Sequence, residues 1–304
     1  MNEKTLFLID GNSLLYRSYY AIQRLSTSQG FPTNAIYGFI STLKKIVEQE
    51  KPDYLGIVFD AKGLTARHAI FKDYKAQRKP MPDDLQVQVP VLKNVIRAMN
   101  IPCLEAAGHE ADDVLGTLAV RAAGENVHAV IVTTDKDLLQ IIDERTSVYN
   151  PAKEIRINAA TVKDYFGVRA SQVTDVLALW GDASDNIPGV PGIGEKTAKE
   201  LINRFGSLDN LLRNLGLIKN PRLKDNIERN FETLELSRRL VTINKDLAVP
   251  FKLDEFALSE PDYGEVGRLF RELEFTALLA EYVKTKEPDK REYTAVFDAA
   301  GLEA

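Results

Sequence analysis

Carboxylates stand in this sequence where apolar runs end and where helices begin. The nine that share this placement are Asp10, Asp60, Glu110, Asp112, Asp113, Asp135, Asp137, Asp182 and Asp185. Gathered at one edge of a sheet they would not stay unpaired, because like charges raise each other's pKa. Divalent cations relieve this repulsion, and oxygen ligands suit Mg²⁺ or Mn²⁺. Two such ions about 3.5–4 Å apart could activate a water and stabilise a leaving oxygen, so the acids predict metal-assisted phosphodiester hydrolysis.

Two apolar strands are predicted to bring the first of these acids together. Thr5–Ile9 ends at Asp10, and Tyr54–Phe59 ends at Asp60. Apolar strands joined through helices indicate an α/β unit with a mostly parallel sheet. Sites in open α/β sheets lie beyond the carboxyl ends of the strands, which is where both acids stand.

The acids that follow come in clusters. Glu110 and Asp113 lie three residues apart at the start of an apolar helix and therefore share one face. Acids in a first helical turn are favourable with the helix dipole, but three around one start exceed what capping needs. Asp135 and Asp137 follow the strand His128–Val132 and fall on one side of an extended chain.

A basic segment lies between the second strand and the next helix. Ala61–Pro82 holds six lysines and arginines against one acid, with Phe71 and Tyr74 interleaved. Cations neutralise backbone phosphates, and aromatic rings stack on unpaired bases. The segment lacks apolar periodicity, as expected of a loop or arch that orders around a ligand. A solvated charged connection is the alternative.

The stretch Trp180–Thr197 combines acids with a glycine- and proline-rich turn. Asp182 and Asp185 precede the turn Gly189–Gly194, which runs into a helix. Backbone N–H groups at such a helix start favour phosphate. The turn lies in a helical half of the chain and not after a first strand, so it is no dinucleotide fingerprint. A helix–turn–helix corner with solvated acids is the alternative interpretation.

Composition bounds these hypotheses. The 304 residues suffice for two domains, and no apolar run has membrane-spanning length. The absence of a secretory signal after Met1 and the single cysteine, Cys103, predict a cytoplasmic protein without an internal disulfide. Cys103 lies in the apolar run Ile101–Leu104 and is predicted to be a core residue. A net charge of −5 argues against a uniformly basic nucleic-acid binder but leaves room for a local basic surface.

The second half of the sequence is predicted to be helical throughout. The expected helices are Ser171–Trp180, Thr197–Phe205, Ser207–Leu215, Leu223–Ile243 and Gly264–Tyr282. The first half mixes strands and helices. This contrast predicts a division near residue 170, and a charged linker follows the last helix.

Six motifs in this order resemble the bacterial 5′-nuclease family, most closely the N-terminal 5′→3′ exonuclease domain of DNA polymerase I, a relative of the flap endonucleases. They are Leu8–Ser13, Phe59–Ala61, Tyr74–Arg78, Glu110–Asp113, Thr134–Asp137 and Gly181–Gly194. The resemblance runs from Asp10 to Thr197, and the helical pattern continues to about Tyr282.

The resemblance implies a PIN-like catalytic domain over residues 1–170, with a helical arch at about 61–84. A helix-three-turn-helix (SAM-like) DNA-binding domain would follow at 171–284, and 285–304 would be a linker or the start of another domain. It implies cleavage of DNA with a 5′ flap, nick or overhang, including removal of 5′ RNA primers in replication and repair. The protein is expected to act as a monomer, with a polymerase domain attached or absent.

The resemblance also implies roles for single residues. One Mg²⁺ would be served by Asp60, Glu110, Asp112 and Asp113, and the other by Asp135, Asp137, Asp182 and Asp185, with Asp10 near both; Mn²⁺ would substitute. The arch residues Lys75 and Arg78 would contact the scissile phosphate, helped by Arg17 and Arg67. Contacts with DNA are implied for Tyr74, Gly189, Val190, Gly192, Ile193, Gly194, Lys196 and Thr197, with a K⁺ ion at this turn.

The sequence departs from the family pattern around Arg67, where Ala66 replaces an expected aromatic residue and Ala69 an expected acid. Two alternatives to the nuclease remain. A PIN-type ribonuclease would share Asp10 and a few acids but would not need the turn Gly189–Gly194. A catalytically inactive flap-binding module would be favoured by a missing acid, and none is missing.

Overall fold

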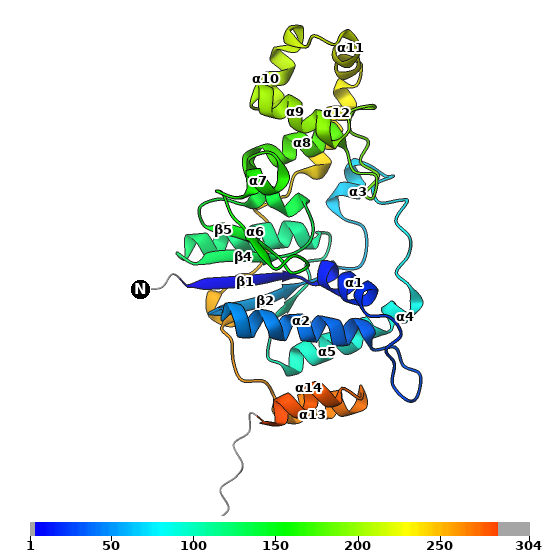
Figure 1. The fold of residues 1–304 in the computed structure, drawn as a ribbon, viewed down its shortest axis with the longest axis vertical. Coiled ribbons are helices and arrows are strands. Elements are labelled where there is room, and N and C mark those ends of the chain that lie inside the picture. Colours follow the sequence, from blue (N-terminus) through cyan, green and yellow to red (C-terminus); the bar gives the residue numbers. More distant parts are fainter. Residues whose placement is uncertain (1–3, 285–304) are drawn as a thin grey trace, which may run out of the picture.

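The computed structural model describes residues 4–284, so the predicted segment 285–304 lies outside the described residues. A six-stranded sheet with the order β3-β2-β1-β4-β5-β6 forms its centre (Figure 1). The strands are β1 Thr5–Asp10, β2 Tyr54–Val58, β3 Cys103–Leu104, β4 His128–Val132, β5 Thr146–Asn150 and β6 Ile155–Ile157. All neighbours are parallel except β5 and β6, which confirms the predicted mostly parallel α/β sheet.

Helices cover both faces of this sheet because its strands are apolar on both sides. In β1, Phe7 and Ile9 join one core while Leu6 and Leu8 join the other, as the alternation of strand side chains requires. The helices α1 (Gly11–Ala21), α2 (Asn34–Glu50) and α5 (Gln88–Ala98) cover the first face. Helix α6 (Ala111–Gly124) covers the second, which continues into the helical half of the chain.

The segment between β2 and α5 is mostly irregular. It contains two short helices, α3 (Ala66–Ile70) and α4 (Asp83–Gln86), with turns between them. Helix α5 begins after Val87, so Pro90 lies in its first turn, where a missing N–H costs no intrahelical bond. Cys103 is exposed, against the expectation that it is a core residue, because β3 is a two-residue strand at the sheet edge.

The helical half rises from one end of the sheet (Figure 1). It comprises α7 Val162–Phe166, α8 Val173–Trp180, α9 Glu195–Phe205, α10 Leu208–Arg213, α11 Pro221–Arg229 and α12 Phe231–Val241, with 3₁₀ turns at Ala170–Gln172 and Leu215–Leu217. The long helix expected at Leu223–Ile243 is two helices, because Asn230 ends α11 and begins α12. The Asn230 side chain donates back to the Asn226 carbonyl, a bond typical of asparagine at helix ends.

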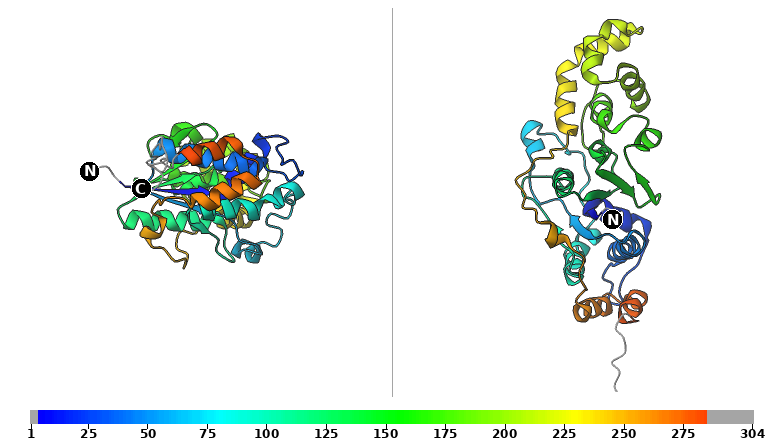
Figure 2. Two further views of the ribbon diagram at one scale, coloured as in Figure 1. Left: turned by 90° about the horizontal axis from the view of Figure 1, so that it is seen from below. Right: turned by 90° about the vertical axis from the view of Figure 1, so that its left-hand side faces the viewer.

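The last two helices return to the sheet. After α12 the chain runs back along the α/β part to a 3₁₀ turn, Leu253–Phe256, against β2. Helices α13 (Tyr263–Glu272) and α14 (Thr276–Lys284) then lie beside α2 and α5, at the opposite end of the molecule from α9–α11 (Figures 1 and 2). The single helix expected at Gly264–Tyr282 is therefore broken, with Glu274 at a φ of 59° between its halves.

A search of the described helices found none with the length and apolarity needed to cross a membrane.

Candidate active site

The carboxyl ends of β1, β2 and β4 meet at one edge of the sheet, and each holds its acid by local bonds. Asp10 caps α1: its side chain accepts from the Ser13 amide at 2.9 Å and from the Thr133 hydroxyl at 2.8 Å. Asp60 accepts from the Asn12 side chain at 2.6 Å and from the Ala111 amide at 2.8 Å, at the start of α6. The strand ends and the helix starts therefore fix both carboxylates in place.

A cavity of about 330 Å³ opens at this edge. Its acidic lining residues are Asp10, Asp60, Asp112 and Asp135. Lys75, Arg78 and Arg17 line the same cavity, so acids and cations from five separate segments converge on it. The remaining five of the nine acids lie outside this lining.

Burial and mutual repulsion shift several of these acids towards the neutral form. Burial, to which the nearby charges of Asp135 and Asp60 add, raises the pKa of Asp10 to about 7. Burial and the charge of Asp135 also raise the pKa of Asp137 to about 7, and the same causes raise the pKa of Asp112 well above its usual value. Near neutral pH such acids are only partly ionised, and a bound cation would favour their charged form.

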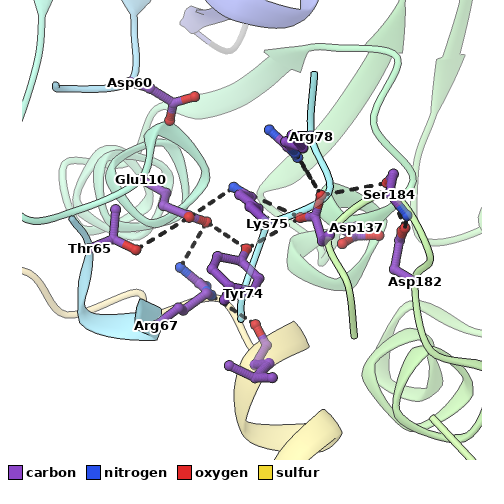
Figure 3. A network of polar contacts seen from close by, with 12 residues as sticks. Asp60, Thr65, Arg67, Tyr74, Lys75, Arg78, Glu110, Asp137, Asp182 and Ser184 are labelled. Atoms are coloured by element: carbon purple, nitrogen blue, oxygen red, sulfur yellow. Dashed lines mark hydrogen bonds and ion pairs between the residues drawn. The ribbon is translucent and has the colours of Figure 1, made fainter. Parts of the chain in front are cut away.

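The acids outside the cavity lining are bound by cations of the chain itself (Figure 3). The Lys75 ammonium lies 2.8 Å from a Glu110 carboxylate oxygen, and the Arg78 Nε donates to Asp185 at 3.0 Å. Within residues 4–284, no three acids, histidines or cysteines stand close enough together to hold one metal directly.

Lys136 is a site residue that the sequence interpretation missed. Its ammonium lies 2.5 Å from Asp182 and 5.3 Å from the centre of the Trp180 ring. Burial lowers the pKa of Lys136, but the nearby acids Asp137 and Asp182 raise it above its usual value overall. Burial likewise raises the pKa of Asp182, but the bond from Lys136 lowers it below its usual value overall. The available signal was a cation placed between two acids, Asp135 and Asp137.

Two arch residues that were expected to face the substrate point inward (Figure 3). The Tyr74 side chain is 3% exposed, and its hydroxyl donates towards Glu110 at 3.1 Å or Asp185 at 3.3 Å. Arg67 is 7% exposed and binds both oxygens of Asp113, at 2.6 and 2.8 Å. Both side chains therefore contact buried acids at the base of the arch instead of facing solvent.

The glycine-rich turn between α8 and α9 is held from behind. Gly189, at a φ of 58°, donates its amide to the Ser237 hydroxyl at 3.0 Å, and Val190 donates to the Leu179 carbonyl. Val190 and Ile193 are buried, so they anchor the turn. Its exposed positions within Gly189–Gly194 are Pro191, Gly192 and Gly194, and Lys196 is exposed in the first turn of α9. Gly194 lies at the start of α9, where first-turn amides point outward.

Two family models match consecutive parts of the sequence. The N-terminal resolvase-like domain of the 5′-3′ exonucleases matches residues 5–167, and their C-terminal SAM fold matches 168–264. The chain belongs to the 5′-3′ exonuclease family. The family and the architecture implied by the sequence motifs are thereby confirmed, and neither the ribonuclease nor the inactive binding module is favoured.

Named relatives of this 5′-3′ exonuclease family member fall into two length classes. A 5′-3′ exonuclease of Aquifex aeolicus is 41% identical over 283 residues, which cover 92% of this chain and 96% of the relative. A DNA polymerase I of Caldicellulosiruptor bescii is 42% identical over 280 residues, covering 90% of this chain but 33% of the relative. The chain thus spans about a third of the length of the polymerase relatives.

The fold of this family member also matches solved structures. The bacteriophage T5 flap endonuclease, solved as a pseudo-enzyme-product complex with DNA and metal ions, superimposes with a TM-score of 0.64 at 20% identity. The match covers 92% of this chain and all of the T5 chain. At that identity the likeness establishes the fold.

Proposed function

We propose that this chain is a structure-specific 5′→3′ exonuclease and 5′-flap endonuclease that hydrolyses phosphodiester bonds of DNA with two divalent cations. The observation that carries the proposal is the cavity at the sheet edge, where Asp10, Asp60, Asp112 and Asp135 face Lys75 and Arg78. Acids that need a metal and cations that bind a phosphate thus line one cavity.

The chemistry of the acids fits divalent cations. The raised pKa values of Asp10 and Asp137 mark carboxylates without sufficient counter-charge. The buried Asp137 Oδ1 has no hydrogen-bond donor within the described chain, although the Lys136 ammonium lies 3.5 Å away. Asp10, Asp60, Glu110, Asp112 and Asp135 would serve one Mg²⁺, and Asp137, Asp182 and Asp185 a second. Both ions would be bound largely through water, because no three of these acids within residues 4–284 lie close enough together to hold an ion directly. The bound ions would supply Lewis-acid stabilisation of the reacting phosphate, and Mn²⁺ would substitute.

Lys75 and Arg78 would bind the scissile phosphate. Both line the cavity, and their present partners, Glu110 and Asp185, are acids that a divalent cation would satisfy instead. Arg17 stands on the same wall, on α1, where its guanidinium would reach a neighbouring phosphate. Exchange of carboxylate for phosphate keeps each cation paired throughout.

The turn before α9 would hold the duplex part of the substrate. Gly192, Gly194, Lys196 and Thr197 stand at the start of α9, where amides and the helix dipole favour a phosphate, and a K⁺ ion would bridge carbonyls and phosphate there. The substrates are DNA with a 5′ flap, nick or overhang, and 5′ RNA primers, which places the enzyme in cytoplasmic replication and repair. A monomer, with or without an attached polymerase, suffices for this task.

A 5′-labelled flap duplex tests the proposal. With Mg²⁺ the wild-type protein should cut near the junction, whereas Asp112→Asn should lose at least about two orders of magnitude in rate because a cavity acid is gone. Asp254→Asn changes an exposed acid of the Leu253–Phe256 turn and should cut normally. Flap binding without cutting in either Mg²⁺ or Mn²⁺ would overturn the proposal that the chain is an enzyme. Faster cutting of single-stranded RNA than of the flap would favour a ribonuclease.

A further inference from the structure

Helix α12 connects the turn before α9 to the acids of the sheet edge. On its side towards the turn, the fully buried Ser237 accepts the Gly189 amide at 3.0 Å. One helical turn further on, α12 ends at Val241, and its last carbonyls need partners outside the helix. The partners of these carbonyls come from the segments that carry the acids.

Arg67 supplies most of them. Its Nε donates to the Leu240 carbonyl at 2.8 Å, and its Nη2 donates to the Thr242 carbonyl at 3.0 Å. The same guanidinium binds Asp113 with both Nη groups. Its Nη1 also donates to Glu110 at 3.2 Å (Figure 3). These contacts account for all five N–H groups of the arginine, so the buried guanidinium has no donor left for a substrate phosphate.

Asp113 is occupied in the same way. Beside its two bonds to Arg67, it accepts the Asn244 amide at 2.8 Å, just beyond the end of α12. It is buried and is absent from the lining of the acidic cavity, whereas its neighbour Asp112 lines that cavity. The two adjacent acids therefore differ in their surroundings: Asp112 lines the acidic cavity, whereas Asp113 is the counter-ion of Arg67.

Gln140 forms a second tie, on the side of the other acids. It lies in the 3₁₀ turn Asp137–Ile141, and its Nε2 donates to the carbonyls of Asp137 and Val241, both at 2.9 Å. Its Oε1 accepts the Ile243 amide at 3.1 Å. The end of α12 is therefore bound to Glu110 through Arg67 and to Asp137 through Gln140.

We propose that Arg67 is a positioning residue: with Asp113 as its counter-ion, it fixes α12 against the carboxylates and so sets which phosphate of a turn-bound duplex reaches them. This inference rests on the proposed nuclease function. It assigns Arg67 and Asp113 away from the phosphate and metal contacts that the sequence motifs suggested. A rigid link of this kind between α12 and the acids affects the position of the cut as well as its rate.

Cleavage mapping at nucleotide resolution on a flap duplex tests this positioning role of Arg67. Arg67→Gln should lower single-turnover cutting by about tenfold or more while flap affinity changes by less than about threefold, because the substrate binds but is misplaced. Its products should spread over neighbouring phosphates instead of one position. Arg121→Gln is the matched control, since Arg121 also binds carbonyls of the chain after α12, at Leu247 and Val249, but contacts none of the nine acids.

Loss of global stability alone would leave the cut position unchanged, so a single wild-type cut site in folded Arg67→Gln overturns the proposal. Equal spreading in Arg121→Gln would overturn it as well. Arg67→Lys, which keeps the charge but not the forked geometry, serves if Arg67→Gln fails to fold and should also spread the products.

Mn²⁺ titration by calorimetry tests the counter-ion role independently of cutting. Asp113→Asn should keep Mn²⁺ affinity within about threefold of wild type, whereas Asp112→Asn should lose about tenfold or more. Equal losses of Mn²⁺ affinity in both variants would show that Asp113 is a metal ligand and would contradict its assignment as a counter-ion. A wild-type protein that binds Mn²⁺ but never cuts would instead refute the proposed function, with the titration still deciding the role of Asp113.

Discussion

Single acids of this site differ in how their negative charge is compensated. Asp182 has its cation in Lys136, which lowers its pKa. Asp10 and Asp137 are buried among other acids and have pKa values raised to about 7, in Asp137 despite the Lys136 ammonium 3.5 Å away. The protein thus neutralises part of the carboxylate cluster with its own cations and leaves another part short of positive charge. The uncompensated part is where a divalent cation gains most.

Divalent-cation affinity should therefore rise steeply with pH between about 6 and 8, because Asp10 and Asp137 must lose protons with pKa values near 7 before they bind a metal. Their pKa values are raised in the folded state, so protons stabilise the metal-free protein. That contribution is lost as the pH rises through 7. Mn²⁺ titrations at pH 6, 7 and 8, with melting curves in EDTA, measure both effects. A pH-independent affinity would contradict the assignment.

Tyr74 shows how burial changes the role expected of a residue. Its ring is buried and its hydroxyl faces two acids, so Tyr74→Phe should cost about 1 kcal/mol, or about 2–4 °C in melting temperature, with flap affinity unchanged. In the control Tyr165→Phe, the lost hydroxyl accepts a hydrogen bond from Asn150 on a more exposed ring, so the loss of stability should be smaller. A large loss of flap affinity in folded Tyr74→Phe would contradict this view, because it would mean that the Tyr74 hydroxyl contacts the substrate.

The sequence indicated which residues form the site better than which way they face. Acids at strand ends were predictable, because parallel apolar strands end at one edge. Asp10, Asp60 and Asp135 do line one cavity, together with Asp112 from the start of α6. The inward placement of Arg67 was not predictable, since a cation in a basic segment has the same local signature whether it meets water or a buried acid. The replacements at Ala66 and Ala69 were the one local hint.

Among the elements, strands and their mostly parallel arrangement were easier to predict than helix breaks. Asn230 and Glu274 interrupt two long apolar-periodic stretches, and neither is a proline or glycine. The return of α13 and α14 to α2 and α5 depends on Val266 and Phe270 fitting a core built by distant residues. Amphipathic periodicity fixes which face of a helix is buried but not what buries it.

The turn before α9 depends on one glycine more than on the others. A Cβ at Gly189 would lie 2.5–2.7 Å from backbone atoms of Trp180 and Gly181, and its φ is positive, whereas a Cβ at Gly194 meets open space. Gly189→Ala should therefore destabilise the protein by about 2 kcal/mol or more and weaken duplex binding, and Gly194→Ala should do neither strongly. Chemical denaturation and flap-binding titrations measure the two effects, and equal stabilities would refute this view of the turn.

On the scale of the whole molecule, a chain of net charge −5 must bind a polyanion. In the proposed function its acids are gathered at one sheet edge, and the groups that would meet phosphates lie at two places, the cavity cations and the start of α9. Helix α12 contacts the turn before α9 through Ser237. One duplex that reaches both would be bound electrostatically at each. Affinity should then depend on salt through the few cations that meet phosphates, and not through the net charge.

Lys196 and Lys199, on the first two turns of α9, separate these contributions. Lys196 is exposed at the start of the helix, whereas Lys199 is paired with Glu195 and lies 4.0 Å from the centre of the Phe166 ring. Lys196→Gln should weaken flap binding similarly for all sequences and reduce the slope of log affinity against log salt by about 0.9, the value for one lost phosphate contact. Lys199→Gln should leave the slope unchanged, because its charge is already satisfied within the protein. Titrations between about 50 and 200 mM salt resolve this difference, and equal slopes for wild type and Lys196→Gln would remove the start of α9 from the DNA interface.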